Sequence, residues 1–244
     1  MDIGQFWHMA LVYPLIEALV FLAAMTGSSG WAIILLTLGM RTLLFPLAWR
    51  QVRAQKARLA LEPLLHAARR RYGRDPQRLN AEIRRIHREQ GVSFVAGCLP
   101  ALVQAPVLFA LYQALTALGE QYAAFQQAFA WVPSLAAPDP WYLLPVLLLL
   151  TQIAVQRIAT PPSQDPQQRQ LNRVSQVAPV VFSFVALRFP AGLVLYWVVS
   201  NAASFVQQYF LTGWGQLFPG GWQPRTPLAG SWQMREATGQ TGAE

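Results

Sequence analysis

The stretch WAIILLTLGMRTLLFPLAW, from Trp31 to Trp49, decides the fold, because it is long and apolar enough to cross a bilayer yet carries an arginine near its middle. As an α-helix it would reach about 28 Å, close to the hydrocarbon thickness of a membrane. Arg41 keeps its charge, and a charge at this depth costs at least about 2.5–3.5 kcal/mol. It must therefore face water, an acidic partner or a protein interior. We expect a polar, hydrated cavity within the membrane, open to anionic cargo; the alternative is that Arg41 snorkels to one surface.

Composition assigns the chain to the polytopic membrane proteins. Of its 244 residues, 54% are hydrophobic and 12% are charged, and that charged fraction is about half of what soluble domains carry. Between Arg50 and Gly91, twelve Lys or Arg stand against four Asp or Glu, so this one segment accounts for the whole net charge of +8. Cys98 is the only cysteine, and no metal-ligand cluster, nucleophile–base set or glycine-rich phosphate loop is recognisable. We expect no cofactor, no metal and no enzymatic catalysis.

Apolar runs predict an all-α protein with five transmembrane helices. The predicted organisation is an N-terminal interfacial helix and turn over 1–29, spans over 30–49, 93–118, 141–158, 174–188 and 190–212, a cytoplasmic helical hairpin over 50–92, an external loop over 119–140, a cytoplasmic loop over 159–173 and a flexible cytoplasmic tail over 213–244. The fourth apolar run, Val174–Leu187, would reach only about 21 Å as a helix. It predicts local thinning of the bilayer, unless the helix begins earlier, near Leu171.

Charge asymmetry predicts the orientation of these spans, because loops on the cytoplasmic side collect Lys and Arg. The basic segment 50–92 is therefore placed inside, and 119–140, which has no Lys or Arg, is placed outside. Five spans then put the N-terminus outside and the C-terminus in the cytoplasm. Phe6–Met25 leaves an alternative open, since it is also apolar. Pro14 and Glu17 favour a helix in the outer interface; if it crossed the membrane, the N-terminus would lie inside.

A helical hairpin is predicted between the first two spans, because apolar residues recur at helical spacing on both sides of Gly73-Arg74-Asp75-Pro76. Gly73 suits a helix C-terminal cap, Asp75 an N-cap and Pro76 a first helical turn. The candidates for contact with cytoplasmic partners are Arg69, Arg70, Arg71, Arg74, Arg78, Arg84, Arg85 and Arg88. They would attract ribosomal RNA or acidic proteins; ordinary positive-inside bias with anionic lipid headgroups explains each of them as well.

Polar residues also occur inside the predicted spans. They are Thr37, Gln104, Thr151, Gln152, Gln156, Tyr196, Trp197, Ser200, Asn201 and Ser204. Singly, such residues more often join helices, at about 0.6 kcal/mol per interhelical hydrogen bond. Together with Arg41, their presence in four of the five spans predicts a shared polar groove, for which Thr151, Gln152 and Asn201 are candidate lining residues.

Three segments resemble the YidC/Oxa/Alb membrane protein insertases. They are GWAIILLTLGMRTLLFPL (Gly30–Leu47), GCLPALVQAPVLFALYQAL (Gly97–Leu115) and FPAGLVLYWVVSNAASFVQQ (Phe189–Gln208). The arginine-rich hairpin between the first two, with Asp-Pro at its tip, is similar to the cytoplasmic hairpin of that family. The likeness covers about residues 30–212.

The resemblance implies a non-enzymatic insertase with five helices around a hydrophilic groove that opens to the cytoplasm and to lipid and is closed on the outer side. Arg41 matches the groove arginine, and Thr37, Gln104, Tyr196 and Trp197 fall where groove-lining or substrate-contacting residues are expected. The implied partners are nascent membrane proteins and the lipid bilayer, with the Sec translocon, the signal recognition particle pathway and the ribosome as further candidates, and no DNA. The implied location is the bacterial inner membrane.

The chain also departs from parts of that family. A short form without a large periplasmic domain is expected, and the tail 213–244 has two Arg against two Glu, so tail-mediated ribosome binding is not expected. Two other classes stay open. One is an assembly scaffold that acts only with the translocon. The other, less supported, is a small-molecule transporter, against which the sequence shows no inverted repeat.

Overall fold

The computed structural model describes residues 2–50, 52, 61–89, 99–160 and 166–212, and its regular structure there is helical apart from one bridge between Phe129 and Val132. The helices are α1 (Ile3–Trp7), a π-helical turn (His8–Val12), α2 (Tyr13–Thr26), α3 (Ser29–Leu43), α5 (Glu62–Tyr72), α6 (Pro76–Glu89), α7 (Leu99–Gln121), a 3-10 turn (Ala123–Gln126), α8 (Leu143–Ala159), α9 (Pro166–Ala186) and α10 (Ala191–Thr212). The expectation of a helical protein is thereby confirmed for the described part of the chain.

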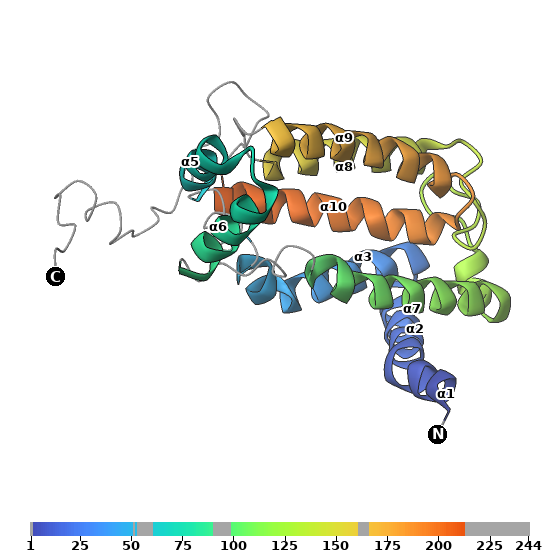
Figure 1. Ribbon diagram of the computed structural model, residues 1–244. Helices are drawn as coiled ribbons and strands as arrows, with labels where there is room; N and C mark the ends of the chain where they lie inside the picture. The colour runs from blue at the N-terminus through green and yellow to red at the C-terminus, as the bar shows by residue number, and fades with distance from the viewer. Residues whose placement is uncertain (1, 51, 53–60, 90–98, 161–165, 213–244) are drawn as a thin grey trace.

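The helices α3, α7, α8, α9 and α10 run alongside one another and form a bundle (Figure 1). Helix α10 lies between the others and contacts α3, α7 and α8, while α8 also contacts α9. The α5–α6 hairpin lies beyond one end of the bundle, here named the hairpin end. Residues 122–142, which join α7 to α8, lie at the opposite end, here named the loop end. The two ends differ sharply in the side chains that they gather.

The main apolar core lies at the loop end. Its largest fully buried side chains are Leu19, Ile33, Leu111, Leu118, Phe125, Val132, Leu135, Leu148, Leu193 and Val194. These positions fall in α2, in the first half of α3, α8 and α10, in the second half of α7 and in the connection between α7 and α8. Burial of apolar surface contributes roughly 25 cal/mol per Å². The loop end is therefore packed with apolar side chains, whereas most polar side chains of α8 and α10 lie toward the hairpin end.

Backbone hydrogen bonds tie the start of α10 to the loop that caps the bundle. The N–H of Ala191 donates to the carbonyl of Ala137 at 2.8 Å, and that of Gly192 donates to Leu135 at 2.9 Å. Both N–H groups belong to the first turn of α10, where a helix leaves its donors without partners of its own. The loop thus supplies the missing acceptors and fixes α10 at this end.

Asp139 organises the other end of the same loop. Its buried carboxylate accepts hydrogen bonds from the N–H groups of Leu144, at 2.8 Å, and Trp141, at 3.1 Å, and from the indole of Trp131, at 3.3 Å. An acid at a helix N-terminus is favoured by the helix dipole. The segment predicted only as an external loop is therefore an ordered cap built around one carboxylate.

The first predicted span is not one continuous helix. Helix α3 ends at Leu43, Leu44 forms a turn, and helical structure resumes at Phe45. Pro46 explains the break, because proline has no N–H and restricts the residue before it. Arg41 consequently lies in the last turn of α3, and not at the middle of a 19-residue helix as the sequence suggests.

The helix that contains the fourth predicted span begins before that span does. Helix α9 starts at Pro166, a residue well suited to a first helical turn, and continues for 21 residues to Ala186. Its first ten residues are mostly polar and include Arg169 and Arg173, so its apolar part is Gln176–Ala186. The helix thus begins early, as the alternative allowed, but its apolar part stays short, and thinning of the bilayer beside it stays a prediction.

The N-terminal helices form a separate arm. From Gly4 to Thr26 the chain makes one helical run of 23 residues with a mean hydropathy of 1.9, so its length and composition would allow it to cross a membrane. This arm runs crosswise to the bundle (Figure 1). It is anchored on α7, where the indole of Trp7 donates to Oε1 of Gln113 at 2.8 Å and Val12 packs against small buried residues. The crosswise direction is what an interfacial helix would require.

Candidate functional site

Arg41 is held on α3 by a serine of α10. Its Nε donates to Oγ of Ser200 at 2.8 Å, and its Nη2 donates to the same oxygen. Ser200 is only 2% exposed, whereas the arginine is half-buried. No carboxylate whose placement the structure describes forms an ion pair with Arg41. A neutral acceptor therefore orients the guanidinium without cancelling its charge.

The end of α3 adds one further contact to this arginine and a favourable dipole. The side-chain amide of Gln207, on α10, donates to the backbone carbonyl of Arg41 at 3.3 Å. That carbonyl is one of the last in α3, and a carbonyl at this position has no partner within its own helix. The negative end of the helix dipole also favours a cation in the last turn. Both the backbone and the side chain of Arg41 are thus fixed against α10.

The spacing of polar residues along α10 explains how one helix meets Arg41. Tyr196, Ser200 and Ser204 recur every four residues and so share one face of the helix. Tyr196 interacts electrostatically with Arg41 and is buried, at 3% exposure. The hydroxyl of Ser204 donates to the carbonyl of Ser200 at 2.9 Å. Ser200 was named among the polar residues of this span but not as a groove residue, and Gln207 was not predicted. Ser200, Ser204 and Gln207 share one face of α10 by helical spacing, which could have grouped them from the sequence.

Thr37 lies one turn before Arg41, as the spacing predicts, but its side chain is turned into the protein. It is 1% exposed, and its hydroxyl donates to the carbonyl of Ile33 at 2.6 Å within α3. Trp197 packs edge-on against Phe182 and Phe189, at ring-centroid distances of 4.6 and 5.6 Å. Both residues therefore take part in packing around the site, and Trp197 joins α10 to α9.

A second polar contact lies on the α8 side of α10. The amide of Asn201 donates to Oγ1 of Thr151 at 3.4 Å, and that hydroxyl in turn donates to the carbonyl of Leu147 at 2.8 Å. Gln152, next along α8, is half-buried. Because Ser200 contacts α3 and Asn201 contacts α8, the predicted groove residues form two clusters on either side of α10. Gln104 lies near the start of α7, and its side chain is outside the described part of the structure.

The hairpin has the predicted caps and a small core of its own. Oδ1 of Asp75 accepts hydrogen bonds from the N–H groups of Gln77 and Arg78, each at 3.1 Å, so the predicted N-cap is confirmed. Gly73 caps the end of α5. The buried residues are Leu61, Ala68 and Ile86, against which Leu65 and Leu79 pack. This core holds the two helices together.

Some of the hairpin arginines are committed to ion pairs. Arg78 pairs with Asp75 at 3.2 Å, and Arg85 contacts Glu82 at 2.6 Å and Glu89 at 3.7 Å. The hydrogen bonds that Arg85 donates to Glu82 raise the pKa of Arg85 above its ordinary value, although the pair is at the surface. Arg69 is half-buried. The exposed arginines without an ion pair in the described part are Arg70, Arg71, Arg74, Arg84 and Arg88. These five are the residues best placed to meet an acidic partner.

Comparison with known proteins gives one consistent result. Residues 21–216 match the 60Kd inner membrane protein family. The chain is 36% identical over 206 residues to the membrane protein insertase YidC of Geobacter sulfurreducens, which covers 84% of this chain and 38% of that protein. It is 37% identical over 205 residues to the YidC of Campylobacter jejuni, with the same two shares. The chain thus spans about two fifths of the length of these relatives.

A solved structure agrees with the sequence relatives. The fold matches a crystal structure described as an active YidC insertase with the first transmembrane domain resolved, with a TM-score of 0.66 and 26% sequence identity. The match covers 84% of this chain and 47% of the other. The likeness therefore extends over most of the bundle described above.

Proposed function

The chain belongs to the 60Kd inner membrane protein family, and from that premise we propose that it is a membrane protein insertase that guides nascent membrane proteins into the bilayer. It acts by providing a path for polar segments and performs no covalent chemistry. Its clients are nascent membrane proteins, and its second partner is the lipid bilayer itself. The relatives quoted above carry the name insertase, which supports this activity for the shared part of the chain.

The membrane arrangement that we propose has five spans, built on α3 with its continuation, α7, α8, α9 and α10. The loop end faces the outside, and the hairpin end and both α5 and α6 lie in the cytoplasm of a bacterial cell. The α1–α2 arm lies in the outer interface, so the N-terminus is outside and the C-terminus inside. The apolar core at the loop end supports a path that is closed on the outer side. The polar contacts of α3, α8 and α10 support a groove that is open on the inner side.

The contact between Arg41 and Ser200 is the observation that carries the mechanism. A serine oxygen leaves the guanidinium with its full positive charge, and charge attraction is strong where water is scarce. An acidic or polar tail of a client therefore enters the groove, displaces Ser200 from the arginine and pairs with it for a short time. The apolar segment that follows leaves sideways into lipid, and the tail then crosses to the outside. Thr151, Gln152, Asn201, Gln104, Thr37, Tyr196 and Trp197 line or support this path.

The exposed arginines of the hairpin provide the cytoplasmic contact. Charge-assisted hydrogen bonds to phosphate or carboxylate suit guanidinium groups. We place the ribosome, the signal recognition particle pathway and the Sec translocon among the partners that this surface serves. Arg70, Arg74 and Arg88 are fully available for such contacts in the described part of the chain.

Insertion into liposomes by the purified chain tests this function. The client is a single-span protein with a short acidic tail, and insertion is scored by protection of the tail from protease. Protection without any added translocon supports an insertase that works alone. Protection that strictly needs added translocon favours the scaffold, and flux of a small solute without protection favours a transporter.

A further inference from the structure

A polar hollow lies between α8 and α9, away from the Arg41–Ser200 contact. It has a volume of about 240 Å³ and is lined by Ile153, Gln156, Arg157, Thr160 and Gln176. Four of these residues belong to the last turns of α8 or follow it directly, and Gln176 comes from α9. By the volume of liquid water, the hollow has room for about eight molecules. It can therefore hold a small polar group, such as a headgroup.

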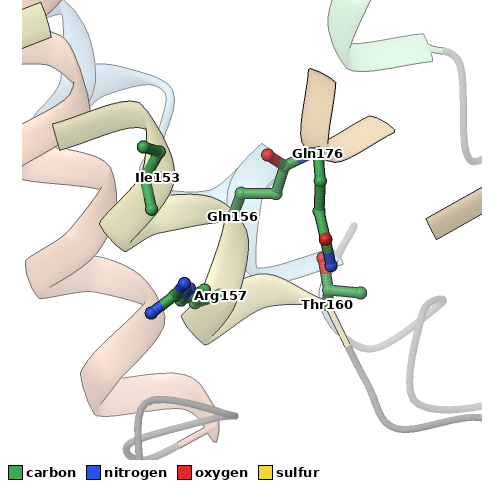
Figure 2. Close-up of a pocket in the computed structure, with 5 residues that line it drawn as sticks. All are labelled: Ile153, Gln156, Arg157, Thr160 and Gln176. Atoms are coloured by element: carbon green, nitrogen blue, oxygen red, sulfur yellow. The ribbon is translucent and has the colours of Figure 1, made fainter. Parts of the chain in front are cut away.

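The lining can both donate and accept hydrogen bonds. Figure 2 shows the side chain of Gln156 directed from α8 toward α9, and that of Gln176 directed from α9 toward Thr160. Each amide carries donors and an acceptor, and the hydroxyl of Thr160 has both functions. None of the described lining residues is acidic. The site thus suits a ligand that has hydroxyl groups of its own.

Arg157 supplies the charge at the edge of this site. It leaves α8 in the turn that also carries Gln156, and Figure 2 shows its guanidinium on the other side of that turn. Its side chain is exposed, so rotation about its flexible stem costs little packing. Arginine binds phosphate through paired N–H groups and does so better than lysine. Once its side chain turns toward the mouth of the hollow, this guanidinium would meet a phosphate there.

The surface beside the hollow is apolar and exposed. On α9 the exposed side chains nearest in sequence to Gln176 are Val177, Val180, Val181 and Phe184. In a membrane such a surface faces acyl chains, whereas the end of α8 and its arginine belong at the headgroup level. Basic pockets between transmembrane helices on the cytoplasmic side are known binding places for lipid headgroups.

We propose that this hollow binds the headgroup of an anionic phospholipid, with the phosphate on Arg157 and headgroup hydroxyls on Gln156, Thr160 and Gln176. The acyl chains lie along the exposed valines of α9. The bound lipid joins the cytoplasmic ends of α8 and α9, which the chain links only through residues 160–165. The inference rests on the membrane arrangement proposed above, but not on insertion activity.

Native mass spectrometry of the purified full-length protein tests the site, with phosphatidylglycerol or phosphatidylcholine added in detergent. We expect phosphatidylglycerol to be retained in preference to phosphatidylcholine. Arg157→Gln should weaken its retention by about tenfold, the effect of one charge-assisted hydrogen bond. Gln176→Leu should weaken it less. Arg188→Gln is the matched control, because Arg188 is exposed near the opposite end of α9, and retention should be unchanged.

Three results would overturn the proposal. Equal retention by the wild type and the Arg157 variant would remove the arginine from the site, and equal loss in the Arg188 variant would indicate charge attraction in general. Full competition by glycerol 3-phosphate would indicate a soluble anion and not a lipid. The liposome insertion assay is run in parallel on each variant. The lipid assay tests only this inference, and the insertion assay tests only the proposed function. A protein that passes one assay and fails the other therefore shows which of the two claims has failed.

Discussion

Ser200 on α10 accepts two hydrogen bonds from the guanidinium of Arg41 on α3, and no other side chain among the described residues accepts a hydrogen bond from this arginine. The two positions are 159 residues apart in the sequence. The contact therefore joins the first and the last helices of the bundle and holds a cation toward its polar end. An acceptor without charge leaves the positive charge of the arginine uncompensated.

Replacing Ser200 by alanine should weaken this junction without removing the charge. Loss of one hydrogen bond to a charged group costs about 1.5–3 kcal/mol, and less here because Arg41 is only half-buried. We expect a lower unfolding temperature in detergent, with insertion of an acidic tail largely preserved. Ser204→Ala is the control: its hydroxyl bonds only within α10, so the unfolding temperature should change little. Equal effects of the two substitutions would contradict a special role for Ser200.

Asp139 should be essential to the cap at the loop end. Asp139→Ala leaves the N–H groups of Leu144 and Trp141 without their acceptor, at a cost of about 0.5–2 kcal/mol for a lost helix cap. We expect a lower unfolding temperature and faster cleavage of 122–142 by protease. Glu120→Ala, which removes an exposed carboxylate at the end of α7, should leave both measurements near the wild-type values. Unchanged cleavage of Asp139→Ala would show that packing alone orders the loop.

Two glycines of α3 should respond in opposite directions to the same substitution. A Cβ at Gly30 would overlap the ring of Phe129, whereas a Cβ at Gly39 would meet nothing within 4 Å. Gly30→Ala should destabilise the protein by about 1–3 kcal/mol through overpacking. Gly39→Ala should stabilise it by up to about 1 kcal/mol, because alanine is the better helix former.

The Gly30 effect should depend on the phenylalanine. Gly30→Ala should lower the unfolding temperature less in a Phe129→Leu background than in the wild type. A double-mutant cycle measures this difference. If the effects of the two substitutions simply add, the overpacking caused by Gly30→Ala does not involve the ring of Phe129.

The hairpin arginines should act through charge at the surface. Replacing Arg70, Arg74 and Arg88 by glutamine should weaken co-sedimentation of the full chain with ribosomes, most clearly at low salt, because exposed charges are screened as salt rises. Arg85→Gln is the control, since Arg85 is already paired with Glu82. If ribosome binding is unchanged by the triple substitution, these arginines do not form the ribosome contact.

The hairpin was the part of the fold most open to sequence prediction. Its caps depend on neighbouring residues, and the N-cap at Asp75 could be assigned from the Gly-Arg-Asp-Pro sequence alone. The apolar runs likewise indicated the long helices. The break at Leu44 was not anticipated, because the run around Pro46 stays apolar and hydropathy does not register a missing N–H. The early start of α9 was missed for a related reason, since its first residues are polar.

The site was predictable only in part. The cost of burying a charge singles out Arg41 from sequence. Its partner does not follow from local spacing, because Ser200 meets Arg41 only when α3 packs on α10. The burial of Thr37 and the separation of Ser200 from Asn201 across α10 are consequences of the same packing. The role of Asp139 does not follow from the sequence, because its three donors are brought to its carboxylate only in the folded loop.

The role proposed for the charge of Arg41 is tested most directly by comparing two clients in liposomes that contain only the purified chain. One client has a short acidic tail and the other has the same tail with its acids replaced by amides. The wild type, Arg41→Lys and Arg41→Ala are compared by protease protection of the tail. We expect the wild type and Arg41→Lys to insert the acidic client and Arg41→Ala to insert it poorly. The neutral client should distinguish the three proteins far less. Equal insertion of the acidic client by all three proteins would contradict the claim that the charge of Arg41 draws the client into the groove.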